Sequence, residues 1–198
     1  MDLFASATAW QPIPLPDGDL ALLSQLPLPI DNATVLARLV EETAWRADTI
    51  TLWGKQFLQP RLTCWQGEAD YRYSGLTMKA QAWSPLVATL RDAVETASGY
   101  RFNSVLLNYY RNERDSMGMH SDDEVELGPA PTIASLSFGA SRNFILRHKQ
   151  SRQTVKLALP SGSLLIMRGP TQSHWLHGIN KSTRVLGPRV NLTFRYIR

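Results

Sequence analysis

The chain has 198 residues, of which 43% are hydrophobic and 19% charged, with a formal net charge of +4. This length and composition are those of one ordinary globular domain, and no apolar run is long enough to predict a membrane span. A single cysteine, Cys64, excludes an intramolecular disulfide and a cysteine-based zinc site. It favours a reducing compartment, so we expect a cytoplasmic protein, or a nuclear one in a eukaryote. Asp2, with no basic stretch before the first apolar residues, argues against a secretory signal.

Residues 10–29 are rich in proline, which predicts an extended, irregular segment that wraps over the domain. These prolines are Pro12, Pro14, Pro16, Pro27 and Pro29. Residues 31–44 follow, with apolar side chains at helical spacing, and are predicted to form an amphipathic helix. The apolar positions are Val35, Leu36, Leu39 and Val40.

A second helix is predicted from residue 85 to about residue 98. Ser84 is suited to the N-cap, Pro85 to the first helical position, and Gly99 to the stop. The apolar stripe of this helix consists of Leu86, Leu90 and Val94.

From about residue 102 the pattern changes to short β-rich segments separated by Gly, Pro and Ser. The expected strands cover residues 104–110, 132–138, 143–148, 154–159, 163–167 and 189–196. We therefore predict helices in the first half of the chain and an all-β second half that forms a sandwich or barrel.

His120 and Asp122 form a His-x-Asp pair in a loop. Residues one position apart in an extended segment point the same way, so both side chains can face one ion. A second histidine would complete a triad that leaves three positions open on an octahedral iron. His174 and His177 compete for that place, and His148 is interpreted as a surface or phosphate-facing residue. The alternative is that this His-x-Asp pair occurs by chance and binds no metal, because the three-residue pattern is common.

The last predicted strand alternates polar and apolar residues. Arg189, Asn191, Thr193 and Arg195 share one face. Two guanidinium groups beside an amide and a hydroxyl suit a small dianion, since arginine binds carboxylates with two parallel hydrogen bonds. The alternative is a strand face exposed to solvent. Two further residues that share a face can add neutral hydrogen bonds to the same anion: Asn108 and Tyr110.

Several short motifs occur in one order between residues 50 and 197. They are Ser74-Gly75-Leu76, Asn108-Tyr109-Tyr110, His120-x-Asp122, Ser135-Leu136-Ser137-Phe138-Gly139, His177 and Arg189-x-Asn191-x-Thr193-x-Arg195. Together they resemble the AlkB family of Fe(II)- and 2-oxoglutarate-dependent nucleic-acid dealkylases. Within it, the motifs are most similar to those of the vertebrate homologue that prefers duplex DNA.

The resemblance implies a mainly β fold with flanking helices, a double-stranded β-helix or jelly-roll. As domain organisation it implies a single domain, with an N-terminal extension and helix (1–45), a nucleotide-recognition lid and support helix (46–100) and a jelly-roll core (101–198). It implies Fe(II), 2-oxoglutarate and O2 as metal and cosubstrates. The implied metal ligands are His120, Asp122 and His177, which leaves His174 a supporting role. The implied 2-oxoglutarate ligands are Asn108, Tyr110, Arg189, Asn191 and Arg195.

On the substrate side, the resemblance makes Trp53 the aromatic residue of a finger loop that fills the base stack after a damaged base has left. Tyr73 would stack on the flipped base opposite His120, and Tyr71 would line the lid. Glu124 would favour a cationic methylated base. Two other readings are open: Trp53 as a packed core residue, and Glu124 as one of several acidic residues that face water.

The implied function is oxidative demethylation of 1-methyladenine and 3-methylcytosine in single- or double-stranded DNA, with release of formaldehyde, by a monomer that binds no membrane. The alternatives are a dioxygenase acting on RNA, a protein side chain or a small metabolite, and a catalytically silent binding module. A basic stretch is suited to phosphate contact or to ordinary surface charge. It comprises Arg142, Arg147, His148, Lys149, Arg152 and Lys156.

Overall fold

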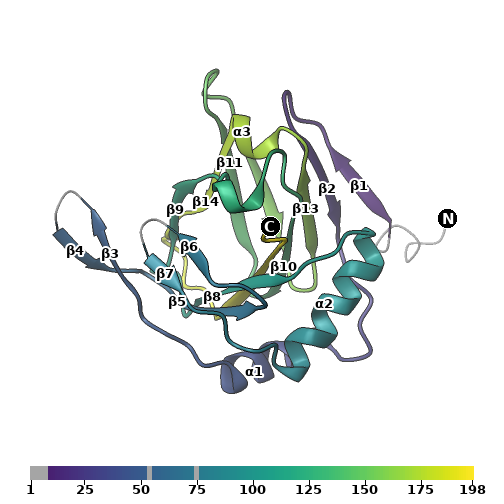
Figure 1. The fold of residues 1–198 in the computed structure, drawn as a ribbon, viewed down its shortest axis with the longest axis vertical. Coiled ribbons are helices and arrows are strands. Elements are labelled where there is room, and N and C mark those ends of the chain that lie inside the picture. The colour runs from purple at the N-terminus through teal and green to yellow at the C-terminus, as the bar shows by residue number, and fades with distance from the viewer. Residues whose placement is uncertain (1–8, 53–54, 74–75) are drawn as a thin grey trace.

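Two antiparallel sheets face each other and two helices cover the outer side of the larger one (Figure 1). The computed structural model describes residues 9–52, 55–73 and 76–198, and the side chains of residues 50–56 and 71–78 lie outside this description. The larger sheet contains, in spatial order, β1 (Trp10–Ile13), β2 (Asp19–Leu23), β13 (Leu164–Arg168), β10 (Ile133–Gly139), β15 (Arg189–Arg195), β8 (Ser104–Tyr110) and β5 (Leu62–Gly67). The smaller sheet contains β12 (Thr154–Leu159), β11 (Arg142–His148), β14 (Trp175–Ile179) and β9 (Met117–His120).

Two hairpins stand outside these sheets, β3 (Thr49–Leu52) with β4 (Lys55–Leu58), and β6 (Tyr71–Tyr73) with β7 (Leu76–Met78). The β3–β4 hairpin projects away from the body of the molecule, whereas the β6–β7 hairpin lies nearer the sheets (Figure 1). Short helical segments complete the fold: α3 (Thr171–His174) and a 3-10 turn (Val125–Leu127).

The two long helices, α1 (Asn32–Glu42) and α2 (Pro85–Ser98), begin and end where local chemistry predicts. The carboxylate of Asp31 caps α1 by accepting from the amide of Thr34 at 2.9 Å. Ser84 occupies the N-cap of α2, but its side chain makes no capping hydrogen bond. Gly99 ends α2 in the left-handed conformation, with φ of 76°, and its amide donates to the Glu95 carbonyl.

The core has two layers. Apolar faces of α1 and α2 pack on the outer side of the larger sheet, against residues such as Val190, Leu192 and Phe194 of β15. A second cluster fills the space between the sheets, where Leu106 of β8 and Leu146 of β11 are both buried. The strand β15 is therefore covered on both faces, and its inner face looks into the space between the sheets.

The prediction of helices first and strands afterwards is wrong, because the described part of the chain before residue 80 already contains seven short strands. The proline-rich segment is also more regular than expected, since β1 and β2 form a hairpin that joins the larger sheet. Pro12 is tolerated because β1 lies at the edge of the sheet, where a missing N–H donor breaks no ladder bond to a further strand.

All six strands predicted after residue 102 are present, two with the predicted bounds, two shifted by one residue at one end and two shifted by one residue at both ends. The strands β9 and β14 were not predicted. Their sequences, Met-Gly-Met-His and Trp-Leu-His-Gly-Ile, contain glycine and little β-branched character, so they carry a weak strand signal. His120 therefore ends a strand, and only Asp122 lies in the following loop. Among the described residues, no helix is long and apolar enough to cross a membrane.

Candidate active site

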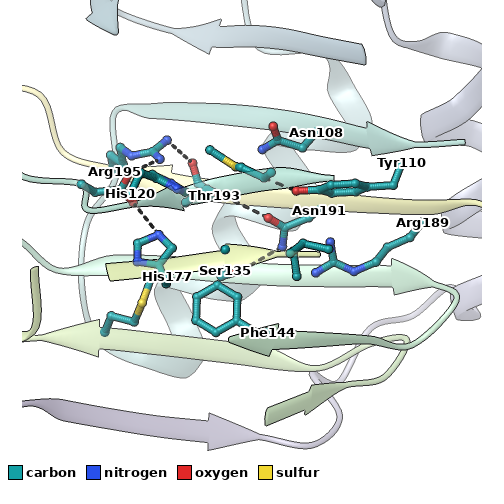
Figure 2. Close-up of a pocket in the computed structure, with 15 residues that line it drawn as sticks. Asn108, Tyr110, His120, Ser135, Phe144, His177, Arg189, Asn191, Thr193 and Arg195 are labelled. Atoms are coloured by element: carbon teal, nitrogen blue, oxygen red, sulfur yellow. Dashed lines mark hydrogen bonds and ion pairs between the residues drawn. The ribbon is translucent and has the colours of Figure 1, made fainter. Parts of the chain in front are cut away.

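A pocket between the two sheets brings together distant parts of the sequence (Figure 2). His120, His177 and Arg195 gather at one end, and Tyr110 and Arg189 at the other. All eight residues expected to bind metal or 2-oxoglutarate line this pocket: Asn108, Tyr110, His120, Asp122, His177, Arg189, Asn191 and Arg195.

Strand pairing explains the polar wall of the pocket. In the register of β15 with β8, Arg189 lies opposite Tyr110 and Asn191 opposite Asn108. Because the sheet is antiparallel and side chains alternate, these neighbouring pairs point to the same face. Arg189 is 2% exposed and Arg195 is 1% exposed. The solvent-exposed alternative for this strand face is therefore wrong.

The smaller sheet supplies the imidazoles. His177 of β14 lies opposite His120 of β9 in the strand pairing, with ring centroids 4.4 Å apart. The Nε2 atom of His120 lies 3.8 Å from Oδ1 of Asp122, and Nε2 of His177 lies 3.9 Å from Oδ2. One ligand atom from each residue falls within 4.8 Å of the others, which is compact enough for one metal ion.

The protonation of these residues suits a divalent metal. Nδ1 of His120 lies 2.9 Å from the Gly118 carbonyl, so Nδ1 carries the proton and Nε2 presents its lone pair toward Asp122. Burial lowers the pKa of His120, and burial together with the neighbouring His120 lowers the pKa of His177 to about 3. Both rings are therefore neutral near neutral pH, as a metal ligand requires.

Asp122 is fully buried and still ionised. Burial alone would raise its pKa, but the Arg195 guanidinium, 2.9 Å from Oδ1, outweighs burial and brings the pKa to about 2. The other carboxylate oxygen, Oδ2, is buried with no hydrogen-bond partner. A buried anionic oxygen without a donor is costly, and a cation held between Asp122, His120 and His177 would satisfy it.

Arg189 lies at the opposite end of the pocket (Figure 2). Its Nη2 donates to the hydroxyl of Ser137 at 2.9 Å, whereas Nε and Nη1 are buried without hydrogen-bond partners. Nε and Nη1 both neighbour Nη2 in the planar group, and either can join Nη2 in the parallel pair of hydrogen bonds that a carboxylate accepts. The residues present therefore fit a 2-oxo dicarboxylic acid whose far carboxylate reaches Arg189 while its other end reaches the metal ligands.

Comparison with known proteins identifies the origin of this arrangement. A model of the 2OG-Fe(II) oxygenase superfamily matches residues 19–195. The DNA oxidative demethylase ALKBH2 of Arabidopsis thaliana is 34% identical over 223 residues, which cover 98% of this chain and 71% of the relative. The chain belongs to the AlkB family. The match to the alpha-ketoglutarate-dependent dioxygenase alkB homolog 3 of Homo sapiens has 44% identity over 82% of this chain, and the match to the ALKBH2 of Mus musculus has 46% identity over 75%.

The identities to alkB homolog 3 and to ALKBH2 are similar, so sequence identity alone does not show which of these two relatives the chain resembles more. This AlkB-family chain spans about 60% of the length of the human homolog 3. The solved structure of OsALKBH1 superposes with a TM-score of 0.67 at 16% identity, covering 94% of this chain and 100% of that one. The expected mainly β jelly-roll fold with flanking helices is thereby confirmed. The family uses Fe(II), 2-oxoglutarate and O2, which the residues of the pocket fit.

Three supporting residues of this AlkB-family pocket were not identified from the sequence. Ser137 holds Arg189, and the buried Arg61 donates from Nε to Oδ1 of Asn108 at 2.7 Å. The side chain of Gln172 accepts from the amide of Asp122 at 2.9 Å. The alternation Ser-Leu-Ser in residues 135–137 was a usable signal for Ser137, since it places both hydroxyls on the inner face. Nothing in the local pattern marks Gln172 or Arg61.

The expected substrate residues are only partly described. Trp53 lies outside the described residues, between the ends of β3 and β4, and the side chains of Tyr71 and Tyr73 on β6 also lie outside them. Glu124 follows the loop of Asp122 and is half-buried. Among the described residues that line the pocket, Glu124 is absent.

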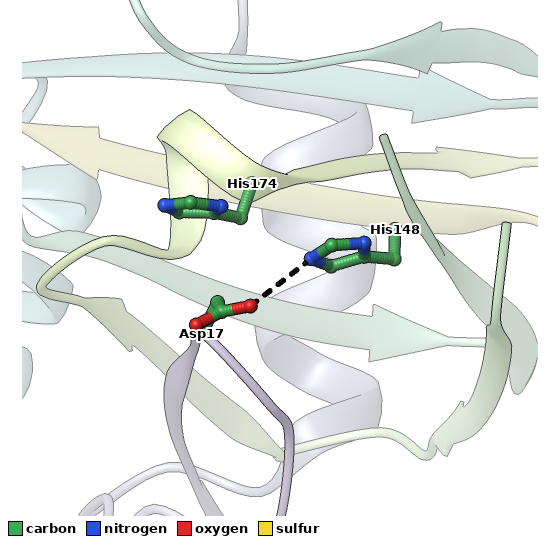
Figure 3. A group of neighbouring side chains, drawn as sticks. All are labelled: Asp17, His148 and His174. Carbon is green, nitrogen blue, oxygen red and sulfur yellow. Dashed lines mark ion pairs between the residues drawn. The ribbon is translucent and has the colours of Figure 1, made fainter. Parts of the chain in front are cut away.

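His148 is not the surface residue expected, because its ring is buried as the last inward side chain of β11. It lies beside His174 and the turn residue Asp17, whose carboxylate is 3.5 Å from Nε2 (Figure 3). Nδ1 of His148 accepts from the amide of Ser151 at 3.0 Å, so in the neutral ring Nε2 carries the proton and faces Asp17. A protonated Nε2 cannot ligate a metal, so this group is an imidazole–carboxylate pair and not a second metal centre.

The basic stretch expected at the surface is divided. Arg142 is buried at the start of β11, whereas Arg152 and Lys156 are exposed. Lys149 bonds to Asp123 and to the Gln172 carbonyl. Only part of this stretch is therefore available to a phosphate.

Proposed function

We propose that this chain is an Fe(II)- and 2-oxoglutarate-dependent dioxygenase that oxidatively demethylates N-alkylated bases in DNA, with 1-methyladenine and 3-methylcytosine as substrates. The observation that carries the proposal is one pocket with a His120–Asp122–His177 group at one end and the unused donors of Arg189 at the other. A protein that only binds a ligand would not need a group of metal ligands at one end of its pocket and carboxylate-binding donors at the other.

The metal ligands in this proposal are His120, Asp122 and His177. When bound, the ferrous ion and 2-oxoglutarate activate O2 and supply the oxidation of the N-alkyl carbon, with succinate, carbon dioxide and formaldehyde as the other products. The side chains orient these partners. Arg189 anchors the far carboxylate of the keto acid.

The remaining cosubstrate ligands in this proposal are Asn108, Tyr110, Asn191 and Arg195. Asn191 is held by the hydroxyl of Ser135 at 2.9 Å, and Asn108 by Arg61, so both amides are fixed before the cosubstrate arrives. Arg195 reaches the same region while holding Asp122 in its ionised form. Fixed donors lose little entropy on binding, which favours a single orientation of the keto acid.

Two features favour DNA as the substrate. Relatives that match over most of this chain are named DNA oxidative demethylases, and the chain carries a formal charge of +4. Positive charge attracts the phosphate backbone. In our proposal Trp53 enters the base stack, Tyr73 stacks on the extruded base and Tyr71 lines the lid. Glu124 favours the positive charge of the methylated base.

We further propose the division of a single domain into the extension 1–45, the lid and support helix 46–100 and the jelly-roll core 101–198. The protein acts as a monomer in the cytoplasm, or in the nucleus of a eukaryote. Size-exclusion chromatography with light scattering tests the monomeric state, because a dimer would show twice the mass.

The proposed function is tested with purified protein supplied with Fe(II), 2-oxoglutarate and O2. The substrates are oligonucleotides of one sequence, as DNA and as RNA, each with one 1-methyladenine or 3-methylcytosine. We expect unmodified base, formaldehyde and succinate in equal amounts from DNA. Repair of RNA alone would reassign the substrate class. Succinate formation with every methylated oligonucleotide left intact would contradict nucleic-acid demethylation altogether.

A further inference from the structure

Two buried guanidinium groups lie close to the ring of Tyr110, at the end of the pocket where Arg189 lies (Figure 2). The Cζ atom of Arg189, on the larger sheet, lies 5.2 Å from the centre of the Tyr110 ring. The Cζ atom of Arg142, on the smaller sheet, lies 5.7 Å from the same centre. Arg142 is 4% exposed and does not itself line the pocket. Contacts of this kind with an aromatic ring are favourable for each cation but do not neutralise its charge.

The carboxylates of Asp115 and Glu113 act on Arg142 from a distance and favour its charge, but burial outweighs them. In the described parts of the chain, neither Arg142 nor Arg189 forms an ion pair. The nearby carboxylate of Asp115 is engaged by Arg111, with oxygens 2.8 and 2.9 Å from the Arg111 guanidinium. Burial lowers the pKa of both Arg142 and Arg189, and the charge of Arg142 lowers that of Arg189 further. Two like charges in a region of low dielectric are costly unless an anion joins them.

The hydrogen bonds of Arg142 do not account for its charge. Its guanidinium donates to three main-chain carbonyls, those of Asn112 at 3.3 Å, Asp115 at 2.9 Å and Asn180 at 2.5 Å. These bonds tie the loop after β8 to the end of β14, and a neutral donor of similar reach would make some of them. These hydrogen bonds therefore do not explain why a charged side chain is buried at this position.

We propose that Arg142 is the second cation for the far carboxylate of the 2-oxo acid, acting from beside Tyr110 without touching the acid, and that it makes the pocket select dicarboxylic over monocarboxylic 2-oxo acids. This inference rests on the proposed function. Arg189 makes the direct contact and sets the position of the carboxylate. Arg142 is a specificity-determining residue that raises the positive potential at that position.

The two roles of Arg142 respond differently to substitution. Arg142→Gln keeps amide donors for the carbonyls but removes the charge, whereas Arg142→Lys keeps the charge but loses the planar fork. A charge acting at a distance is worth on the order of 1 kcal/mol in a partly screened site, which corresponds to a change of about fivefold in affinity. Only a ligand with a far carboxylate should sense it.

The test is calorimetric titration of Mn(II)-loaded protein, which does not turn over, with 2-oxoglutarate and with 2-oxopentanoate, its monocarboxylic counterpart of equal length. We expect Arg142→Gln to weaken 2-oxoglutarate binding about fivefold and leave 2-oxopentanoate unchanged. Arg142→Lys should preserve the wild-type ratio of the two affinities. Equal losses for both acids in Arg142→Gln would show a purely structural role and overturn the inference.

Folding is monitored in parallel by urea denaturation. If Arg142→Gln does not fold, Arg142→Met takes its place as the neutral variant: a selective loss of 2-oxoglutarate affinity supports the inference, and equal losses for both acids contradict it. A wild-type protein that binds no 2-oxoglutarate would overturn the proposed function itself. Wild-type binding with an unaltered Arg142→Gln variant overturns only the role of Arg142.

Discussion

The guanidinium of Arg195 donates to Oδ1 of Asp122 at 2.9 Å, and both side chains are almost completely buried. A residue of β15 thus holds the carboxylate of Asp122, which lies in a loop 73 residues earlier in the chain. A buried pair of this kind gives little net stability, but removal of one partner leaves an uncompensated charge. This asymmetry gives the first prediction.

Arg195→Met should raise the pKa of Asp122, because burial then acts on the carboxylate without its cation. The metal-free protein should lose about 3–5 kcal/mol of unfolding free energy, measured by urea denaturation. The double variant Arg195→Met/Asp122→Asn removes both charges and should recover part of that loss. A double variant less stable than Arg195→Met would show that the stranded charge is not the cause.

Asp122→Ala should abolish metal binding and base repair, because it removes the only carboxylate of the candidate metal group. Co(II) titration followed by visible absorption measures the metal directly. Asp123→Ala is the matched control, since Asp123 is the next residue but is exposed and pairs with Lys149. We expect this control to bind Co(II) and repair DNA within about twofold of the wild type. Normal Co(II) binding by Asp122→Ala would remove the basis of the proposed function.

Asp115 provides a pH-dependent prediction away from the metal group. Burial would raise the pKa of Asp115, but hydrogen bonds from Arg111 outweigh it and hold the pKa below the ordinary value of 3.8. A carboxylate whose pKa is lower in the folded state stabilises the fold above its unfolded pKa. That contribution is lost as the pH falls below 3.8 toward the folded pKa.

Asp115→Asn should therefore cost about 1.5–3 kcal/mol of unfolding free energy near neutral pH, the usual worth of hydrogen bonds to a charged group. The difference between variant and wild type should shrink in acid, below the ordinary pKa of the carboxyl group. Urea denaturation at neutral and acidic pH measures both values. A difference that is the same at every pH would refute the assignment to the ionised carboxylate.

A site residue was predictable from the sequence where its position depends on local pattern, and was not where it depends on contacts between distant segments. The face formed by Arg189, Asn191, Thr193 and Arg195 was predictable because alternation within one strand is a local property. The choice between His174 and His177 was not, because it depends on the pairing of β14 with β9, two strands with weak local signals. The family resemblance favoured His177, and the structure brings that residue to the pocket.

Burial was the property that local patterns predicted least well. His148 and Arg142 lie in a basic stretch that reads as a charged surface, yet both point inward from β11. An alternating strand has one buried face whatever its charge, and the partner strands β12 and β14 decide which face that is. The run of short strands predicted a sandwich or barrel, and the family resemblance implied the jelly-roll. Of the early strands that the structure describes, β1, β3, β4, β6 and β7 have only three or four residues, too few for a clear alternation, and β2 lies in a proline-rich stretch.

The last prediction concerns Trp53, which follows β3 in the sequence and lies outside the described residues. If it fills the gap left by an extruded base, Trp53→Ala should lower repair of duplex DNA about tenfold, since loss of stacking costs on the order of 1–3 kcal/mol. Repair of single-stranded DNA should change little, because no partner strand has to be held open. Phe57→Ala is the matched control: Phe57 is an exposed aromatic residue on the same hairpin, 45% accessible, and is not assigned to the base stack. Initial rates on duplex and single-stranded oligonucleotides of one sequence give the ratio of duplex repair to single-strand repair for each variant. A Trp53→Ala ratio equal to that of Phe57→Ala would mean that the hairpin contributes only general affinity and that Trp53 does not enter the stack.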